Sequence, residues 1–183
     1  MKATGIVRRI DDLGRVVIPK EIRRTMRIRE GDPLEIFTDR EGEVILKKYS
    51  PIGELSDFAQ EYAESLQQAT GHITCISDKD NIIAVVGATK KEFMGKRLSK
   101  ELEKMIHDKK ASLLETNEST VNIVEDQEGE SPFTSQVIAS IVTYGDAIGA
   151  VILASKDEKV KMGEIEIKLA ETAANFLGKQ MEQ

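Results

Sequence analysis

The stretch GRVVIPKEIRR, residues 14–24, decides how the first part of the chain folds. Residues 15–18 are mostly β-branched, which favours a strand, and the glycine before them favours a turn. The proline that follows fits the first turn of a helix, because its fixed φ suits that place and its missing N–H would be unpaired there. We therefore expect a strand over residues 15–18 and a short helix over residues 19–26, with Ile22 and Met26 on its buried face.

Charge is distributed unevenly along the chain. The whole chain has a net charge of −6, but residues 1–29 hold 9 basic and 3 acidic groups, or +6. Residues 51–183 hold 14 basic and 23 acidic groups, or −9. A basic segment on an acidic protein favours a polyanion as the partner of that segment.

The composition is that of a globular protein, since 40% of the residues are hydrophobic, which is too many for a disordered chain. The single cysteine, Cys75, excludes an intrachain disulfide and favours a reducing compartment. Charged residues near the N-terminus stand where a signal peptide would be apolar, and the longest apolar run, residues 147–154, is too short to cross a bilayer. We expect a cytoplasmic protein without a membrane partner.

Residues 1–50 have the pattern of a small domain rich in strands. We expect further strands over residues 4–10, 34–38 and 43–49, and a turn over residues 11–14. About 50 residues bury too small a fraction of their surface to be stable alone, and no cysteine or metal site stabilises this segment. We therefore predict that residues 1–50 form an obligate dimer.

A second domain, residues 55–183, follows a short linker over residues 51–54. Apolar residues recur at helical spacing over residues 54–68 and 162–181, which predicts a helix at each end of the domain. The pattern between them predicts a charged helix over 99–109 and strands over 72–77, 82–86, 119–124, 137–144 and 147–155. The last strand is continuously apolar and is therefore expected at the centre of the sheet. The fold expected for this domain is α/β (α+β).

The first and last helices of the second domain each carry an apolar stripe. Because two such helices can lie on one face of the sheet and also pair with a second molecule, we expect them to join dimers into a tetramer. The expected interface residues are Leu55, Phe58, Tyr62, Leu66, Ile165, Leu169 and Phe176.

Basic side chains of the first domain are candidate contacts to nucleic acid. They are Lys2, Arg8, Arg9, Arg15, Arg23 and Arg24. The planar fork of arginine suits bidentate contacts with phosphate or guanine, although a solvated basic face is the alternative reading of these residues. Residues 1–29 contain no aromatic residue. Since single-strand binders usually stack bases on aromatic rings, duplex DNA is the favoured partner.

Residues 1–49, and above all the run GRVVIPKEIRR, resemble the AbrB-type transition-state regulators. The resemblance implies a swapped-hairpin β-barrel with a short helix, formed by two interleaved chains that bind duplex DNA. It implies structural roles for Gly14 and Pro19 and places Arg9 at a position that is basic in close relatives. The DNA contacts that it implies are Arg8, Arg15, Arg23 and Arg24.

The second domain resembles GAF-like domains in the order of its elements. Regulators that join an AbrB-type domain to a GAF-like domain act on gene expression in the developing spore, so the resemblance implies an activator or repressor of sporulation genes. The GAF-like domain would sense a small-molecule effector or assemble the chains. The sequence specifies neither a ligand nor a cofactor.

The remaining candidate residues do not predict an enzyme. Cys75 lies within an apolar strand and is expected to be a buried core thiol, and His72 and His107 have no Cys or His at metal-ligand spacing. The acidic residues 125–130 are expected to form a solvated loop. No Ser/His/Asp set, paired-carboxylate spacing or zinc motif appears, so we expect no catalytic and no metal site.

Two other functions stay open at this point. Some antitoxins share the swapped-hairpin domain, but they carry a short disordered tail for their toxin, whereas this chain continues into a patterned domain. The other alternative is a metabolite-sensing or enzymatic protein whose first domain only joins the chains. A first domain that fails to bind DNA would favour it.

Overall fold

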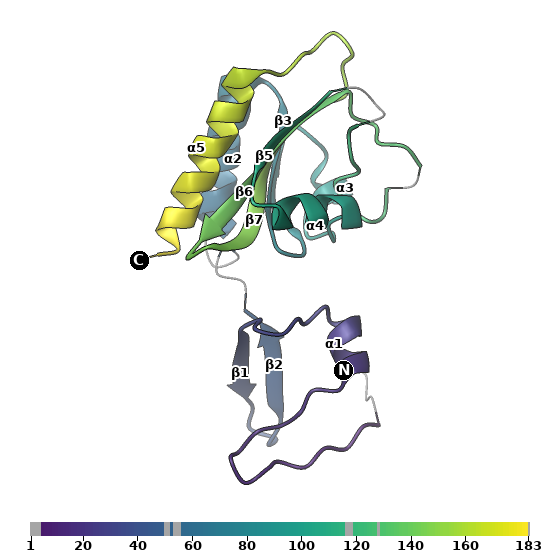
Figure 1. Cartoon of the computed structure of the whole chain (residues 1–183), viewed down its shortest axis with the longest axis vertical. Coiled ribbons are helices and arrows are strands. Elements are labelled where there is room, and N and C mark those ends of the chain that lie inside the picture. Colours follow the sequence, from purple (N-terminus) through teal and green to yellow (C-terminus); the bar gives the residue numbers. More distant parts are fainter. Residues whose placement is uncertain (1–4, 50–51, 53–55, 116–118, 128, 183) are drawn as a thin grey trace. The chain divides into compact units, whose positions relative to one another are not determined.

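The computed structural model describes residues 5–49, 52, 56–115, 119–127 and 129–182. The chain divides into two compact units, Met1–Tyr49 and Ser50–Gln183 (Figure 1). We refer to them as the first unit and the second unit and describe each by itself.

Residues 5–49 of the first unit contain one short helix and one hairpin. Helix α1 spans Lys20–Thr25 and follows Pro19, the one buried residue among residues 5–49. Strands β1 (Leu34–Thr38) and β2 (Val44–Lys48) pair antiparallel, with Ile36 opposite Leu46. The helix and the hairpin therefore form where the sequence predicts them, because the proline and the turn residues fix their ends.

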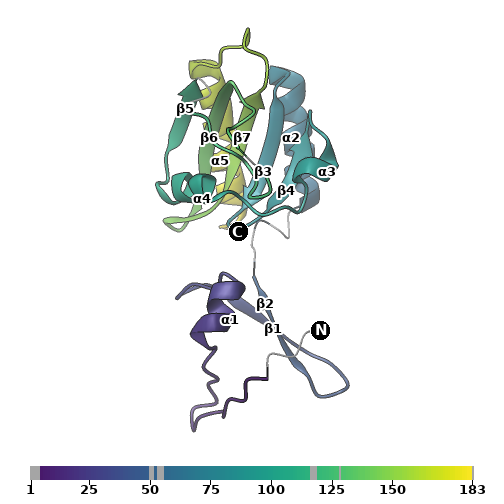
Figure 2. The same ribbon diagram turned by 90° about the vertical axis from the view of Figure 1, so that its right-hand side faces the viewer.

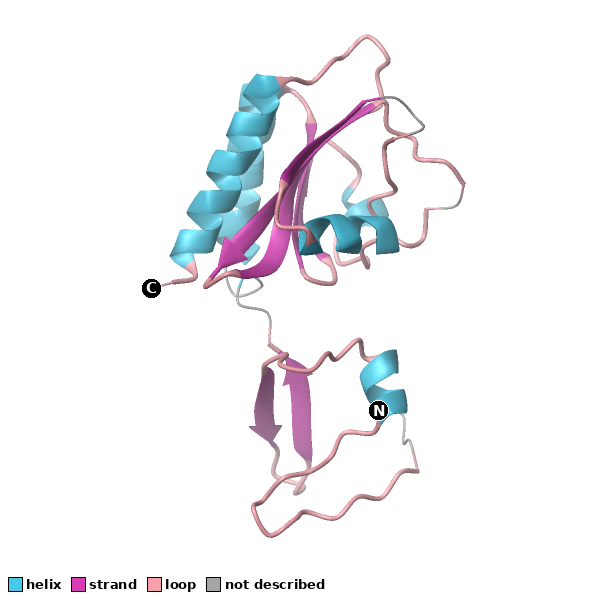
Figure 3. Cartoon of the chain, in the orientation of Figure 1, coloured by secondary structure: helices cyan, strands magenta, loops and turns pink. Residues whose placement is uncertain are grey.

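The expected strands over residues 4–10 and 15–18 are not strands in this single chain, as the loop representation in Figure 3 shows for residues 5–10 and 15–18. A strand needs hydrogen bonds to a neighbour, and only the turn between these segments is paired. The N–H of Asp11 donates to Arg15 O at 3.0 Å, and Gly14, whose φ is +75°, closes the turn. The two segments thus carry strand-forming residues without a partner strand.

The buried face predicted for the first helix is wrong for a single copy. Helix α1 has no buried residue, Ile22 is half-buried, and the side chain of Met26 is 55% exposed. Among the described residues of the first unit, α1 therefore finds too little apolar surface to bury this face fully.

The second unit is a five-stranded antiparallel sheet with helices on both faces. The strand order is β4-β3-β7-β6-β5, so the predicted central place of the apolar last strand is confirmed. The elements are α2 (Ser56–Thr70), β3 (Ile73–Asp78), β4 (Ile82–Val86), α3 (Lys90–Phe93), α4 (Lys100–His107), β5 (Ala111–Glu115), β6 (Ser135–Thr143), β7 (Asp146–Ser155) and α5 (Glu164–Gln180).

Helices α2 and α5 lie on one face of this sheet, as predicted, and α3 and α4 lie on the other (Figures 1 and 2). Each face has its own apolar core. Ile76, Val151 and Leu153 belong to the core beneath α2 and α5, and Phe93 and Phe133 belong to the core beneath α3 and α4. Successive side chains of a strand point to opposite faces of the sheet, so each strand can contribute residues to both cores.

Two glycines of the second unit allow close approach, one between two neighbouring strands of the sheet and one between the sheet and α5. A methyl group on Gly149 of β7 would overlap the carbonyl oxygen of Ser77 on β3. A methyl group on Gly178 of α5 would overlap the carbonyl oxygen of Val142 on β6. Both glycines are therefore required by packing and not by an unusual φ.

The strand predicted over residues 119–124 is wrong, and two short elements, α3 and β5, were not predicted. Residues 119–124 form only an isolated bridge at Val124. A buried side chain replaces the missing ladder: Val121 N–H donates to Gln136 Oε1 at 2.8 Å, and Gln136 Nε2 donates to Val121 O at 2.8 Å. A β-rich segment whose backbone is satisfied by a side-chain amide has no need of a neighbouring strand.

Candidate nucleic-acid interface

The predicted DNA-contacting arginines lie on three exposed segments of the first unit. Arg8 and Arg9 lie on the extended segment, Arg15 closes the turn, and Arg23 and Arg24 lie in the last turn of α1. All five are exposed. Lys2, the sixth predicted contact, lies outside the described residues.

The turn at residues 11–15 holds one arginine in place. Asp11 Oδ1 accepts from the N–H of Leu13 at 3.0 Å and of Arg15 at 2.8 Å, and Asp11 Oδ2 accepts from Arg15 Nε at 2.8 Å. The backbone N–H of Arg15, followed by its side chain, lowers the pKa of the Asp11 carboxyl. The aspartate therefore stays charged in this turn and fixes the plane of the Arg15 guanidinium.

The end of α1 presents a second pair of cations. Arg23 and Arg24 lie at the C-terminal end of the helix, where the macrodipole favours positive charge. Thr25 Oγ1 donates to Glu21 O at 2.9 Å on the same short helix. A cationic turn and a cationic helix end each offer donors to the phosphates and base edges of a duplex.

The first unit exposes most of its large apolar residues. They are Ile6, Val7, Ile10, Leu13, Val16, Val17, Met26, Ile36, Phe37, Val44, Leu46 and Tyr49. One face of the hairpin is the clearest case, because Ile36 lies opposite Leu46 and Val44 opposite Thr38, and Ile36 is 68% exposed. The opposite face includes Phe37, with Lys47 Nζ 4.8 Å from its ring centre.

The structure places the residues of the predicted oligomer interface in different environments. Phe176 of α5 stacks on Phe58 and Tyr62 of α2, with ring centres 5.7 Å and 5.5 Å apart. Leu66 is only 5% exposed because it packs in the core, so it offers little area to a second molecule. Leu55 lies outside the described residues.

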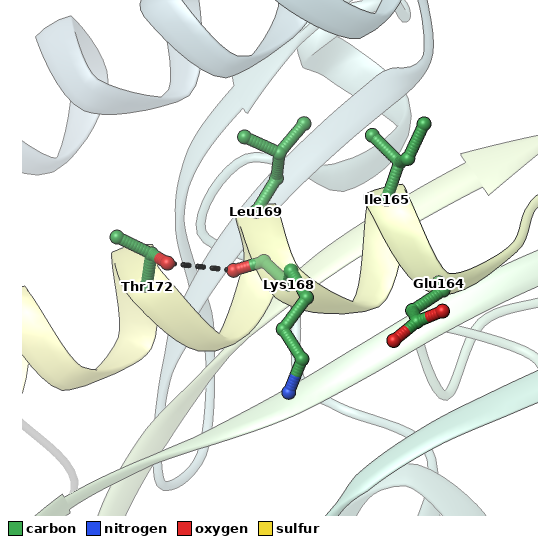
Figure 4. A pocket seen from close by; sticks show the side chains of 5 residues that line it. All are labelled: Glu164, Ile165, Lys168, Leu169 and Thr172. Atoms are coloured by element: carbon green, nitrogen blue, oxygen red, sulfur yellow. Dashed lines mark hydrogen bonds between the residues drawn. The ribbon is translucent and has the colours of Figure 1, made fainter.

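The outer face of α5 carries the remaining predicted interface residues. Ile165, 72% exposed, and Leu169 project from the same side of the helix, whereas Glu164 and Lys168 project from the other (Figure 4). With Thr172 these residues line a shallow groove of about 390 Å³. The groove is mixed in character, with apolar and charged residues next to each other.

The other candidate residues are structural. Cys75 is fully buried, as predicted, and burial raises its pKa to about 12. His72 Nε2 lies 3.7 Å from Glu166 Oε1, a contact between the start of β3 and the first turn of α5 that the sequence did not predict. His107 is exposed at the end of α4. No group of three metal-ligating side chains occurs among the described residues.

Three further features concern the surface. Within the described ranges, no helix has both the length and the apolar character needed to cross a membrane. In the acidic segment, Glu125, Asp126 and Glu130 are exposed, and Asp126 pairs with Lys96 at 3.6 Å. The loop beside this segment also forms a cavity that the sequence did not indicate, because its lining residues come from separate segments.

Two family models match the chain. The model described as "Stage V sporulation protein T C-terminal, transcription factor" matches residues 54–182. The model described as "Antidote-toxin recognition MazE, bacterial antitoxin" matches residues 7–54. The first match covers most of the chain and the second covers about a quarter of it.

Relatives and a solved structure agree with the division into two units. Stage V sporulation protein T of Bacillus subtilis is 58% identical over 183 residues, the full length of both chains. The transition state regulatory protein AbrB of the same organism is 59% identical over 63 residues, 31% of this chain and 65% of its own length. The GAF domain of an Acinetobacter phosphoenolpyruvate-protein phosphotransferase covers 70% of this chain and 82% of its own, at 14% identity and a TM-score of 0.58. The predicted AbrB-type and GAF-like fold class is confirmed by these matches.

Proposed function

Because the chain belongs to the stage V sporulation protein T family, we propose that it regulates the transcription of sporulation and transition-state genes by binding duplex DNA. The family model over residues 54–182 is described as a transcription factor and the relative AbrB is named as a regulatory protein, in agreement with the sequence prediction that the chain is not an enzyme. The observation that carries the proposal is the set of five exposed arginines on the extended segment, at the turn and on α1 of the first unit. A protein of this kind acts at the nucleoid.

The first unit binds DNA as a dimer in this proposal. Its exposed apolar residues and its two extended segments without partner strands support the dimer, because a second copy would supply both a core and the missing ladders. Two copies of residues 1–29 bring a net charge of about +12 to one body, which strengthens phosphate contact.

The second unit assembles dimers into a tetramer through α2 and α5. Phe58, Tyr62 and Phe176 form one aromatic cluster across the two helices, and Ile165 extends the apolar surface along α5. Several DNA-binding domains on one assembly raise the occupancy of spaced sites through effective concentration. The same unit is also the proposed place of an effector site, since its surface carries a groove on α5 and a cavity beside α4.

The test is a titration of the full chain with duplex DNA at several salt concentrations. Binding by arginine–phosphate contacts predicts that log K falls linearly with log salt, with a slope of about −0.9 per phosphate neutralised. A parallel titration of the fragment 1–55 measures what the second unit adds. Absence of duplex binding by the full chain at low salt would refute the proposal.

One observation favours a second candidate function. Residues 7–54 match the MazE antitoxin model, so the first unit is compatible with an antitoxin that binds DNA and a toxin. The folded second unit, with a core on each face of its sheet, is unlike a disordered tail that wraps a toxin. Stoichiometric co-purification with a small toxin would support this candidate. If no toxin co-purifies, DNA regulation is the one function that the proposal keeps.

A further inference from the structure

The turn at residues 11–15 is held by both carboxylate oxygens of one aspartate. The N–H of Asp11 donates to Arg15 O at 3.0 Å, and the N–H of Gly14 donates to Asp11 O at 3.0 Å. Asp11 Oδ1 accepts from the N–H groups of Leu13 and Arg15, at 3.0 Å and 2.8 Å. The other oxygen, Oδ2, accepts from Arg15 Nε at 2.8 Å. The two oxygens thus differ in their partners, because Oδ1 binds the backbone and Oδ2 binds a side chain.

The turn between β1 and β2, residues 39–43, has the same backbone pattern. Asp39 Oδ1 accepts from the N–H groups of Glu41 and Glu43, at 3.0 Å and 2.9 Å. The N–H of Asp39 donates to Glu43 O at 3.2 Å. Gly42, with φ of +86°, donates its N–H to Asp39 O at 3.4 Å. One aspartate oxygen and one glycine at positive φ are therefore enough to close a turn of this kind.

The two turns differ in the residue that closes them. Glu43 stands where the first turn has Arg15, and an ionised glutamate has no hydrogen to donate to the aspartate. The second turn thus forms without any contact to Oδ2 from this position. The contact of Asp11 Oδ2 with Arg15 Nε is an addition that the backbone does not need, and its role lies with the arginine.

The arginine that Asp11 holds still has donors for a ligand. A guanidinium has five N–H groups, and Nε carries one of them. No other hydrogen bond of the Arg15 side chain occurs among the described residues, and this side chain is 69% exposed. The terminal nitrogens Nη1 and Nη2 are therefore available to donate. Together they match the O6 and N7 acceptors that guanine presents in the major groove.

The charge of Asp11 acts on the choice between base and phosphate. The N–H of Arg15, followed by its side chain, lowers the pKa of the Asp11 carboxyl, so the group is ionised at neutral pH. A carboxylate beside the arginine repels an approaching phosphate, whereas a base edge has no net charge. The aspartate thus favours a base edge as the partner of Arg15.

We propose that Asp11 is a positioning residue for sequence recognition, which orients Arg15 so that the terminal nitrogens of its guanidinium bind a guanine in the major groove. The inference rests on the proposed function, since it concerns the same duplex DNA. Asp11 adds selectivity and weakens the attraction for DNA of any sequence, because its charge opposes the phosphates. Arg15 remains a cation at the DNA surface, so it contributes to the salt dependence as well as to selectivity.

The experiment compares two duplexes on the full chain at one salt concentration. The first is selected by the unaltered chain from a randomised library, and the second is its scrambled version of equal length and composition. Asp11→Asn keeps an oxygen for the backbone N–H groups but replaces Oδ2 by an amide nitrogen, which cannot accept from Arg15 Nε. We expect the ratio of the two affinities to fall at least about fivefold, while the scrambled duplex binds as tightly as before or more tightly.

Two matched controls separate this role from the effects of charge and of turn structure. Asp12→Asn removes the same charge from an exposed neighbour that has no hydrogen bond to Arg15. Asp39→Asn makes the same change in the matching turn. Both should keep the affinity ratio of the unaltered chain. In the Arg15→Ala background, Asp11→Asn should cause no further fall in the ratio, because Asp11 acts through that side chain.

Three results would overturn the inference: an unchanged ratio in Asp11→Asn, an equal fall in either control, or a further fall in the Arg15→Ala background. Equal binding of all sequences by the unaltered chain would also overturn it, while leaving DNA binding by the first unit in place. Failure of the proposed function is a different result, namely that the unaltered chain binds no duplex at low salt. Circular dichroism and light scattering check that each variant keeps its fold and its mass.

Discussion

The two units of this chain bury their apolar residues in different places. In the second unit the apolar residues form a core on each face of one sheet, and only four of the large apolar residues that the structure describes there are exposed. In the first unit twelve large apolar residues are exposed, and Pro19 is the one buried residue among residues 5–49. The second unit has what it needs to fold from one chain, whereas the first has the residues of a core without the partner that would cover them.

The two units also differ in how they position their candidate functional residues. The first unit places arginines on a turn and a helix end whose geometry is set locally, by Pro19 and by the Asp11–Arg15 contact. The second unit brings together residues that are distant in the sequence, as in the aromatic cluster of Phe58, Tyr62 and Phe176. Changes in each unit should therefore have different consequences, which the following predictions measure.

The largest effect is expected from a charge on the apolar face of the first hairpin. Ile36→Asp would place an unpaired carboxylate in the proposed core between two copies, at a cost of several kcal/mol. We expect duplex-DNA affinity to fall at least about 100-fold and the mass measured by light scattering to fall by half. Met94→Asp, at an exposed apolar residue of the second unit, is the control. If Ile36→Asp were as harmless as Met94→Asp, the first unit would have no intermolecular core.

The second prediction concerns the close packing of the second unit. Gly149→Ala places a methyl group on the carbonyl of Ser77, and two paired backbones must separate to admit it. We expect a loss of about 3 kcal/mol in the free energy of unfolding, measured by denaturant titration. In Gly163→Ala the nearest atom to the new methyl group is 3.9 Å away, so this variant should lose about 1 kcal/mol or less. Equal losses of stability in the two variants would show that β3 and β7 do not approach each other closely at Gly149.

The third prediction tests whether the face of α5 joins dimers. Ile165→Asp removes the most exposed apolar residue of this helix, and we expect a tetramer to become a dimer in light scattering. Duplex-DNA affinity should fall about tenfold, because fewer DNA-binding domains are linked. Asn175→Asp, an exposed position of α5 outside the predicted interface, should leave the mass unchanged. A mass that is the same in both variants would place the interface elsewhere.

The fourth prediction concerns the arginines themselves. Arg15→Ala and Arg24→Ala should each weaken duplex binding by about tenfold and reduce the salt slope by about 2 per dimer, because each variant removes one contact from both copies. Arg40→Ala, in the hairpin turn outside the predicted contacts, is the matched control in titrations at several salt concentrations. Loss of affinity in Arg40→Ala alone would mean that the DNA surface lies at the hairpin turn.

The smallest effect is expected at the start of α5. Burial acts to raise the pKa of Glu166, but the N–H groups of Gly163 and Glu166, together with His72, lower it overall. Because the pKa is lower in the folded state, the stabilisation is present above the unfolded pKa and is lost as pH falls through the folded one. Glu166→Gln should therefore cost about 1 kcal/mol at pH 7, and this difference should vanish in acid below the folded pKa. Urea titrations at several pH values measure it, and a difference that persisted in acid would contradict the assignment.

Some parts of the fold follow from local chemistry and were predicted correctly. The helix after Pro19 and the hairpin around Gly42 depend on residues whose φ preferences act without tertiary help. The central place of β7 follows from its unbroken apolar run. In contrast, residues 119–124 look like a strand in sequence, but Gln136 takes the place of the neighbouring strand. No local pattern indicates that a buried amide 15 residues away will do so.

The sequence by itself determined the basic first unit, its arginines, the turn and helix that carry them, and the helix–sheet–helix order of the second unit. These features depend on composition, on periodicity and on residues close together in the chain. Only the tertiary structure decided which apolar residues are covered and which hydrogens are already donated. It buried Leu66 while exposing Ile165, and it left Asn122 Oδ1 without a hydrogen-bond partner among the described residues. Burial and hydrogen-bond saturation depend on residues that are distant in sequence and meet only when the sheet is complete. The periodicity of the sequence therefore does not predict them.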